Sequence, residues 1–363
     1  MNTNKTTEFD RQMMRRCFQL AQNGLGRVAP NPMVGSVITY ESKIIGEGFH
    51  RKYGEAHAEV NAINSVKDKS LLKNATLYVN LEPCSHYGKT PPCADLIIAN
   101  NIPKVVISNM DPHRKVAGKG IEKMQNAGIE VTQGLLKQEG RFLNRRFFML
   151  HEQQRPWIIL KWAESMDGFV DIDRLIENEK KPTWLTNQTA KHIVHKWRGE
   201  EQAILIGNRT AILDNPQLNV REWAGQNPLR ILIDPQLKAG TTNHIFSDIT
   251  TTLIFNNIKN EVRGTNTFIK TDGNTPIIHQ IIKELYARNI QSVIIEGGTI
   301  VLNHFIENNL WDEAQRFVGE IHLGNGIRAP QFKAQPTKSV HLGNNTLFTY
   351  FHKNTDWNCA ETT

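Results

Sequence analysis

The chain has 363 residues, a formal net charge of +7, 39% hydrophobic residues and 22% charged residues. These values are typical of a folded globular protein, they exclude a disordered or fibrous chain, and the length predicts two domains. No apolar run reaches the roughly 20 residues that a membrane span needs. The first ten residues lack the apolar core of a signal peptide, which predicts a cytoplasmic protein.

The number of cysteines and the distribution of charge indicate which kinds of ligand the chain binds. Four cysteines are too few for a disulfide framework in a chain of this length, and two of them cluster, which favours metal binding. Cys17 is predicted to be a core residue on an apolar helix face, whereas Cys359 falls in a polar tail. The positive charge is spread along the chain without a Lys/Arg block, which favours a phosphorylated small ligand over nucleic acid.

The first half alternates helix and strand signals. Apolar spacing and turn residues predict helices at 8–23, 57–65, from about 90, at 118–126 and over 136–155. Strands are predicted at 34–40, 43–49, 75–80, 104–109 and 129–133. Such alternation predicts a layered α/β domain, here over residues 1–150.

Pro156 marks a boundary, and a second α/β domain is predicted over residues 156–363. Its strands are expected at 157–163, 202–206, 229–233, 251–255, 267–271 and 292–296, and its helices at 187–200, 275–288 and 299–309. The first strand is not followed by G-x-G-x-x-G, so a Rossmann dinucleotide site is not predicted. A Gly-Gly pair at Gly297 and Gly298 follows an apolar strand and opens a helix, a context that suits backbone N–H groups cradling phosphate.

The first domain carries a metal-ligand pattern, His57-Ala58-Glu59 followed by Cys84 and Cys93. His57 and Cys93 fall near predicted helix starts, where partial positive charge and free N–H groups favour thiolate ligands, and Cys84 follows a predicted strand. Three protein ligands leave one zinc position open for water, whereas a structural site normally closes with four. Glu59 is then free to transfer protons, as in the H-x-E and P-C-x-x-C pattern of nucleobase deaminases.

The spacing and flanking residues resemble one family closely. The blocks that carry the resemblance in the first half are residues 30–35, 46–50, 54–60 and 81–93, the last of which places eight residues between Cys84 and Cys93. In the second half they are 160–168, 184–187, 197–199, 204–210, 213–221 and 293–298. The chain resembles the bifunctional deaminase/reductase of riboflavin biosynthesis over nearly its whole length and in the expected order. The resemblance implies a cytidine-deaminase-like three-layer domain followed by a dihydrofolate-reductase-like α/β domain.

The resemblance also implies two reactions. The first is zinc-dependent hydrolytic deamination of 2,5-diamino-6-ribosylamino-4(3H)-pyrimidinone 5′-phosphate. The second is NADPH-dependent reduction of the ribosyl side chain to ribityl. In the deaminase it assigns zinc to His57, Cys84 and Cys93, and proton transfer to Glu59. The substrate contacts that it implies there are Asn31, His50, His86, Lys89 and Asp111.

Residue roles in the reductase are likewise carried over from the resemblance. NADPH contacts are expected from Ala163, Trp184, Thr210, Asp214, Gly298, Thr299, Ile300, Val301, Leu302, Asn303 and His304. Substrate contacts are expected from Ser165, Arg198, Leu218, Arg221 and Glu296. Arg198 and Arg221 are candidates for the ribose phosphate, because guanidinium pairs bidentately with phosphate. Lys161 is a candidate proton donor near the reacting carbon.

Three positions depart from the family pattern. His113 stands where the family usually has Asn, Pro182 stands where a Ser often contacts substrate, and residues 319–326 lack the usual paired glycines. The departures in the second half leave open a deaminase with an impaired reductase. A nucleic-acid deaminase is a further alternative, although a short C-x-x-C would then be expected. A homo-oligomer is expected, with no nucleic-acid or membrane partner.

Overall fold

The computed structural model describes residues 6–85, 91–113, 117–173 and 183–353. The chain divides into two compact units between Gln153 and Gln154. The helices of the first unit are α1 (Glu8–Gln22), α2 (Ala58–Ser65), η1 (Lys69–Asn74), α3 (Cys93–Ala99), α4 (Lys119–Asn126), α5 (Lys137–Leu143) and α6 (Arg145–Gln153). Its strands are β1 (Gly35–Tyr40), β2 (Lys43–Phe49), β3 (Thr76–Leu81), β4 (Lys104–Asn109) and β5 (Glu130–Gln133).

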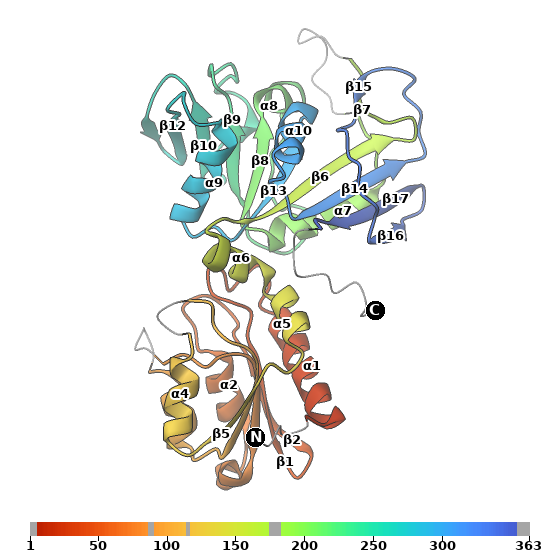
Figure 1. Cartoon of the computed structure of the whole chain (residues 1–363). Helices are drawn as coiled ribbons and strands as arrows, with labels where there is room; N and C mark the ends of the chain where they lie inside the picture. The colour runs from red at the N-terminus through yellow and green to blue at the C-terminus, as the bar shows by residue number, and fades with distance from the viewer. Residues whose placement is uncertain (1–5, 86–90, 114–116, 174–182, 354–363) are drawn as a thin grey trace. The chain divides into compact units, whose positions relative to one another are not determined.

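The first unit is a three-layer sandwich. Its strands form one sheet in the order β2-β1-β3-β4-β5, in which β3, β4 and β5 are parallel. Successive side chains of a strand point to opposite faces. Tyr78 therefore packs with α1 and α5 on one face, while Leu77 and Val79 pack with α2, α3 and α4 on the other. Figure 1 shows the two helical layers on either side of this sheet.

Local sequence explains where α1 begins and where the last helices of this unit separate. Thr7 and Asp10 form a reciprocal capping box at the start of α1, and Cys17 is fully buried on the inner face, as predicted. The single helix expected over 136–155 is wrong, because Asn144 separates α5 from α6. The side chain of Asn144 is buried and bonds to both backbone groups of Met33, at 2.8 and 2.9 Å.

The second unit contains one large sheet with helices on both faces. Its helices are α7 (Gln188–Glu200), α8 (Asn208–Leu213), η2 (His244–Phe246), α9 (Ile277–Ala287) and α10 (Thr299–Glu307). Its strands are β6 (Trp157–Ser165), β7 (Phe169–Asp171), β8 (Ala203–Gly207), β9 (Leu229–Ile233), β10 (Thr252–Asn256), β11 (Glu261–Arg263), β12 (Asn266–Lys270), β13 (Ser292–Gly297), β14 (Glu313–Gly319), β15 (Ile327–Arg328), β16 (Lys338–His341) and β17 (Asn345–Phe351).

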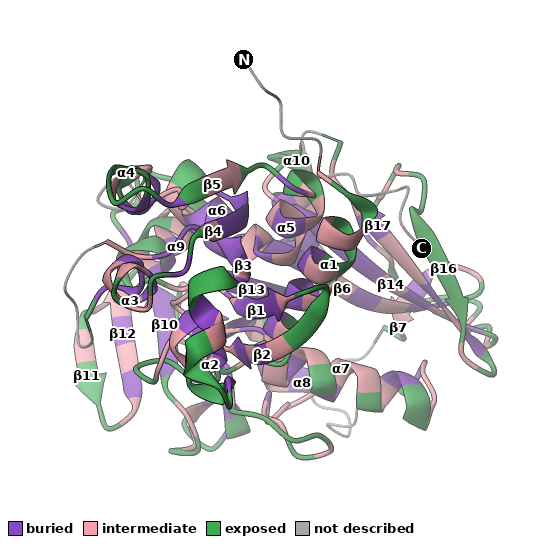
Figure 2. Cartoon of the chain, turned by 90° about the horizontal axis from the view of Figure 1, so that it is seen from below, coloured by how far each residue is buried: buried purple, intermediate pink, exposed green. Residues whose placement is uncertain are grey.

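The strand order in this sheet is β11-β12-β10-β9-β8-β13-β6-β14-β17-β16, and β15 pairs separately with β7. The run from β12 to β14 is parallel, whereas β11, β17 and β16 are antiparallel to their neighbours. Parallel strands covered on both faces are apolar throughout, as in the fully buried β8. In Figure 2 the strands β10 and β13 accordingly carry the buried colour.

The helices of the second unit cover opposite faces of the sheet. Helices α9 and α10 pack on one face through Ile281, Leu285 and Phe305. Helix α7 packs on the other face, where Ala190 contacts Phe317 and Leu347. No helix in the described part of the chain is both long enough and apolar enough to cross a bilayer.

Candidate active sites

The metal-ligand candidates of the first unit converge from three elements. His57 is the N-cap of α2, Cys93 is the first residue of α3, and Cys84 lies three residues beyond the end of β3. Their ligand atoms all lie within 4.8 Å of one another. The Cys93 backbone N–H donates to the Cys84 sulfur at 3.3 Å, so the start of α3 supports negative charge on this thiol.

The distances fit a tetrahedral zinc ion. Zn–N bonds of about 2.05 Å and Zn–S bonds of about 2.3 Å place N and S about 3.6 Å apart at a tetrahedral angle. His57 Nδ1 lies 3.6 Å from Cys84 Sγ and 3.3 Å from Cys93 Sγ. A hydrogen bond from the Cys93 thiol lowers the pKa of Cys84, and the same contact raises the pKa of Cys93. One imidazole and two thiols therefore form a donor set suited to zinc.

Glu59 lies beside these ligands without belonging to them. It is in the first turn of α2, and its side chain is only 3% exposed. Burial raises the pKa of this carboxyl to about 7, against the opposing effect of His57. A carboxyl with a pKa near neutrality takes up and releases protons readily, which suits general acid–base catalysis.

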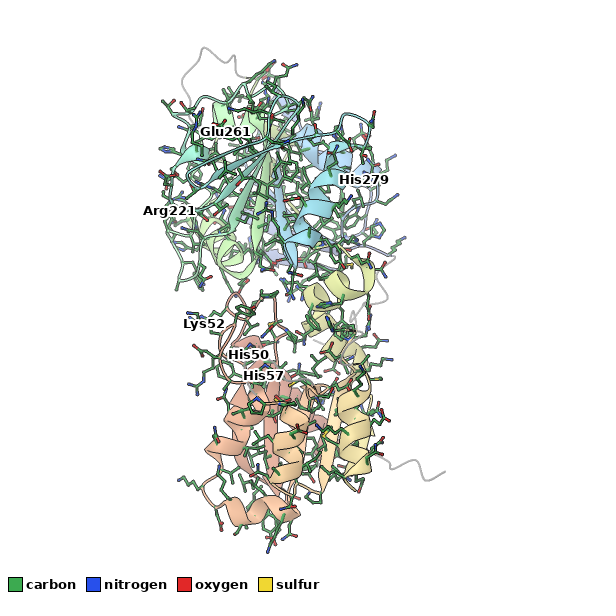
Figure 3. All side chains as sticks on the ribbon, turned by 90° about the vertical axis from the view of Figure 1, so that its left-hand side faces the viewer. His50, Lys52, His57, Arg221, Glu261 and His279 are labelled. Atoms are coloured by element: carbon green, nitrogen blue, oxygen red, sulfur yellow. The ribbon has the colours of Figure 1, made fainter. Side chains whose placement is uncertain are left out.

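Two of the predicted substrate contacts are bonded to each other. Asn31 Nδ2 lies 3.1 Å from His50 Nε2, and His50 Nδ1 lies 3.1 Å from the carbonyl oxygen of Ala56. The His50 ring stands edge-on to the ring of His57, with centroids 5.4 Å apart, and Figure 3 shows the two side chains close together. Burial lowers the pKa of His50, which favours the neutral ring that this bonding pattern requires.

Of the remaining predicted substrate contacts of the first unit, the structure describes only Asp111. Burial raises the pKa of Asp111 to about 6, and its side chain accepts a bond from the His113 backbone N–H at 2.7 Å. The His113 ring packs against His151, with centroids 5.3 Å apart. His86 and Lys89 lie outside the described residues.

A buried charge cluster marks the second unit. Arg198 on α7 forms an ion pair with Glu296 at the end of β13, with Nη2 and Oε2 2.9 Å apart. Burial alone would raise the pKa of Glu296, but Arg198 and Lys161 outweigh it and bring the pKa to about 2. Burial lowers the pKa of Lys161, an effect that Glu296 opposes. Two cations and one carboxylate from different elements therefore face one another.

Helix α7 also brings His195 to this cluster. His195 precedes Arg198 by three residues and is buried on the same face of the helix. Its Nδ1 accepts a bond from the Arg221 backbone N–H at 3.4 Å. Burial and the nearby Arg198 lower the pKa of His195 to about 4. His195 was not among the residues predicted from the sequence, although its spacing from Arg198 was a usable signal.

The predicted NADPH residues come from several elements, and Gly298 at the start of α10 lies close to Thr210 on α8. Gly298 is the N-cap of α10, and a Cβ atom there would lie 3.5 Å from Thr210 Oγ1. Trp184 is 61% exposed, with the Lys191 ammonium 5.3 Å from its ring centroid. Val301 and Leu302 pack their side chains into the core, so only their backbone groups can face a ligand. The other predicted NADPH residues are Ala163 on β6, Asp214 at the end of α8, and Thr299, Ile300, Asn303 and His304 on α10.

The predicted substrate residues of this unit differ in how far they are exposed to solvent. Ser165 is fully buried and bonds to Asp167 in the turn after β6, at 2.6 Å. Leu218 is also buried, with a φ of 50°. Arg221 is exposed and is labelled in Figure 3.

Two of the departures from the family pattern, Pro182 and residues 319–326, lie in the second unit. Pro182 lies outside the described residues. Asp167 accepts bonds from the backbone N–H groups of Leu323 at 3.1 Å and Gly324 at 2.7 Å. The 319–326 segment is therefore bonded to the turn that follows Ser165.

Comparisons with known proteins follow the same division of the chain. Residues 7–109 match the cytidine and deoxycytidylate deaminase zinc-binding region, and residues 156–350 match the RibD C-terminal domain. The riboflavin biosynthesis protein RibD of Aquifex aeolicus is 36% identical over 88% of this chain and 89% of its own length. The chain belongs to the RibD family.

Other members of the family match over nearly their full length. The Escherichia coli protein is 32% identical over 91% of this chain and 96% of its own. A crystal structure from Thermotoga maritima, described as a diaminohydroxyphosphoribosylaminopyrimidine deaminase/5-amino-6-(5-phosphoribosylamino)uracil reductase, superposes with a TM-score of 0.84. It is 34% identical, and the match covers 94% of this chain and 98% of that chain. Acinetobacter baumannii RibD gives a TM-score of 0.83 at 30% identity, covering 95% and 99%.

RibD membership confirms the predicted fold class and the enzyme class. The first unit is a cytidine-deaminase domain and the second a dihydrofolate-reductase-like domain. The chain is a bifunctional deaminase and reductase of riboflavin biosynthesis, with a zinc motif at His57, Cys84 and Cys93 and a reductase domain that implies a nicotinamide cofactor. The roles assigned to individual substrate and NADPH residues stay predictions.

Proposed function

We propose that the first unit deaminates 2,5-diamino-6-ribosylamino-4(3H)-pyrimidinone 5′-phosphate and that the second reduces the ribosyl side chain of the product with NADPH. The observation that carries this proposal is the presence of two separate sets of chemical groups in one RibD chain. One is the zinc donor set with Glu59 beside it, and the other is the buried cluster of Lys161, Arg198 and Glu296.

In the deaminase, His57, Cys84 and Cys93 hold the metal, which when bound supplies a Lewis acid that brings the pKa of its water ligand to about 7. Glu59 then carries the protons. Its carboxylate accepts one from the attacking water and delivers it to the ring nitrogen. It then takes the second proton from the newly added hydroxyl group and passes it to the amino group, which leaves as ammonia. Glu59 is buried beside His57 and Cys93, so its carboxyl lies next to the position where the metal would be held.

In the reductase, NADPH supplies the hydride, and the protein orients the substrate and supplies charge. We assign Lys161 as the donor of the proton that reduction of the sugar requires. Glu296 opposes the fall in the pKa of Lys161 and so favours its charged, proton-donating form. We assign the phosphate to Arg221, whose exposed guanidinium bonds to Asn219 through Nη1 and can pair with a phosphate through Nη2, with Arg198 nearby.

The ion pair of Arg198 with Glu296 limits how many of its N–H groups can bind the phosphate. Its Nε and Nη2 groups both bond to Glu296, so they are occupied before substrate arrives. Arg198 therefore acts on the phosphate mainly through its remaining Nη1 group and its charge. The positive charge of the whole chain supports a phosphorylated substrate. The cytoplasmic location and the homo-oligomer stay predictions.

The test follows both products in one tube. The diamino-pyrimidinone ribosyl phosphate is added to the zinc-loaded full chain with NADPH, and ammonia and NADPH absorbance are recorded together. Ammonia release followed by NADPH oxidation is the expected result. Ammonia without NADPH oxidation would establish the alternative of an impaired reductase, and no ammonia would refute the proposed deaminase substrate.

A further inference from the structure

The Glu82 carboxylate has an unusual set of partners. It lies one residue beyond β3, two residues before the zinc ligand Cys84, and it is only 4% exposed. One oxygen accepts from the backbone N–H groups of Asp111 at 3.2 Å and Gly118 at 3.0 Å. The other accepts from Gly120 at 3.0 Å and Ile121 at 3.4 Å.

These bonds connect two parts of the chain that are far apart in sequence. The donors are the segment that begins at Asp111 and the first turn of α4, while the acceptor belongs to the segment that carries Cys84. Among the residues that the structure describes, all hydrogen-bond partners of this carboxylate are backbone N–H groups. A buried carboxylate is costly unless such bonds are complete, so its position is closely constrained.

The backbone of α4 at Gly120 also lies very close to the backbone of Pro83. A Cβ atom at this position would lie 2.1 Å from the carbonyl oxygen of Pro83, well inside van der Waals contact. Only glycine therefore permits the start of α4 to lie against the residue that precedes Cys84. The contact and the carboxylate bonds fix the same two segments to each other.

We propose that Glu82 is a positioning residue of the deaminase, which holds the Asp111 segment against the zinc-ligand segment so that Asp111 meets the substrate. The inference rests on the proposed function of the first unit and on the substrate contact that the family resemblance implies for Asp111. The carboxylate of Glu82 bonds to the backbone of Asp111 and of the start of α4, so it acts through the backbone at Asp111.

The test replaces Glu82 by Gln in the zinc-loaded full chain. Gln keeps the size of the side chain, but its amide N–H₂ faces two N–H donors, so half of the bonds are lost. We expect the KM of the deaminase to rise at least about tenfold, with kcat, zinc content and the reductase rate near those of the unchanged protein. Glu122→Gln is the matched control, because Glu122 is an exposed residue of α4, the helix whose first turn donates to Glu82.

A double variant separates positioning from general stability. If Glu82 acts through Asp111, then Glu82→Gln adds less than about twofold to the KM of an Asp111→Asn protein, because the two changes remove one interaction. Hydrogen exchange gives a readout that does not depend on activity. The amides of Gly118, Gly120 and Ile121 are expected to exchange faster in Glu82→Gln and at the unchanged rate in Glu122→Gln.

An unchanged KM in folded Glu82→Gln, or an equal rise of KM in the Asp111→Asn background, would overturn the inference. If Glu82→Gln does not fold, Glu82→Asp keeps the charge on a shorter side chain, and the same readouts apply. Failure of the proposed function is distinct, because the unchanged protein would then release no ammonia from the pyrimidine substrate.

Discussion

Replacing Glu59 by Gln tests the proton-transfer role most directly. The two side chains have nearly the same volume, so the buried position beside His57 is filled without a cavity. A positioned general acid–base contributes about 10²–10⁴ in rate, which corresponds to about 3–5 kcal/mol in the activation free energy. Because the amide of the variant cannot accept the proton that the Glu59 carboxylate accepts, we expect the loss in the kcat of the deaminase.

The assay measures ammonia release, zinc per chain and NADPH oxidation on the deaminated substrate. Zinc content should be unchanged, since Glu59 is not one of the three ligands that converge in the structure. The reductase rate serves as an internal reference within the same chain. Glu55→Gln is the matched control, because Glu55 is exposed and lies two residues before His57. A zinc-loaded Glu59→Gln protein whose deaminase kcat stays within about threefold of the original would refute the proton-transfer role.

Three further predictions follow from the two sites. Cys93→Ser should lower zinc per chain, measured by atomic absorption after dialysis, because one thiolate donor is lost; full zinc retention would contradict the ligand assignment. Arg198→Met should destabilise the second unit by about 1–3 kcal/mol, because Glu296 loses its ion-pair partner and keeps only the opposing charge of Lys161. Denaturant unfolding compared with Arg209→Met, a change at an exposed arginine, measures this loss. His195 has a pKa of about 4 in the folded chain, below the 6.5 of an unfolded histidine, so the unfolded state binds the additional proton. The contribution of the neutral His195 ring to stability is therefore complete above pH 6.5 and is lost as the pH falls toward 4. In His195→Gln, the melting temperature should depend less on pH over this range.

The zinc site could be predicted because its signals are local. Glu59 lies two residues from His57, and each ligand falls where a strand or helix boundary is visible in the sequence. Spacing and boundary together indicated which side chains would meet. The family resemblance then supplied the substrates, which no spacing of ligands could give.

Long-range contacts explain what the sequence did not reveal. The carboxylate of Glu82 bonds to backbone groups 29 to 39 residues later, and backbone donors carry no residue-type signal. Asn144 interrupts a segment of good helix formers because it bonds to Met33 instead. No strand was predicted after residue 309, although the aromatic residues Phe348, Tyr350 and Phe351 of β17 are typical of strands and were a usable signal.

The pairing of Asn144 with Met33 also orders events during synthesis. The carbonyl oxygen of Met33 accepts bonds from the side chains of Asn80 and Asn144, each at 2.9 Å. A ribosome releases the chain from its N-terminus, so the segment that contains Asn31 is complete only after residue 144 has emerged. By then every zinc ligand has been outside the ribosome for some time. The bonds that Asn144 makes to Met33 are therefore among the last of this unit that can form, after His57, Cys84 and Cys93 have all been synthesised.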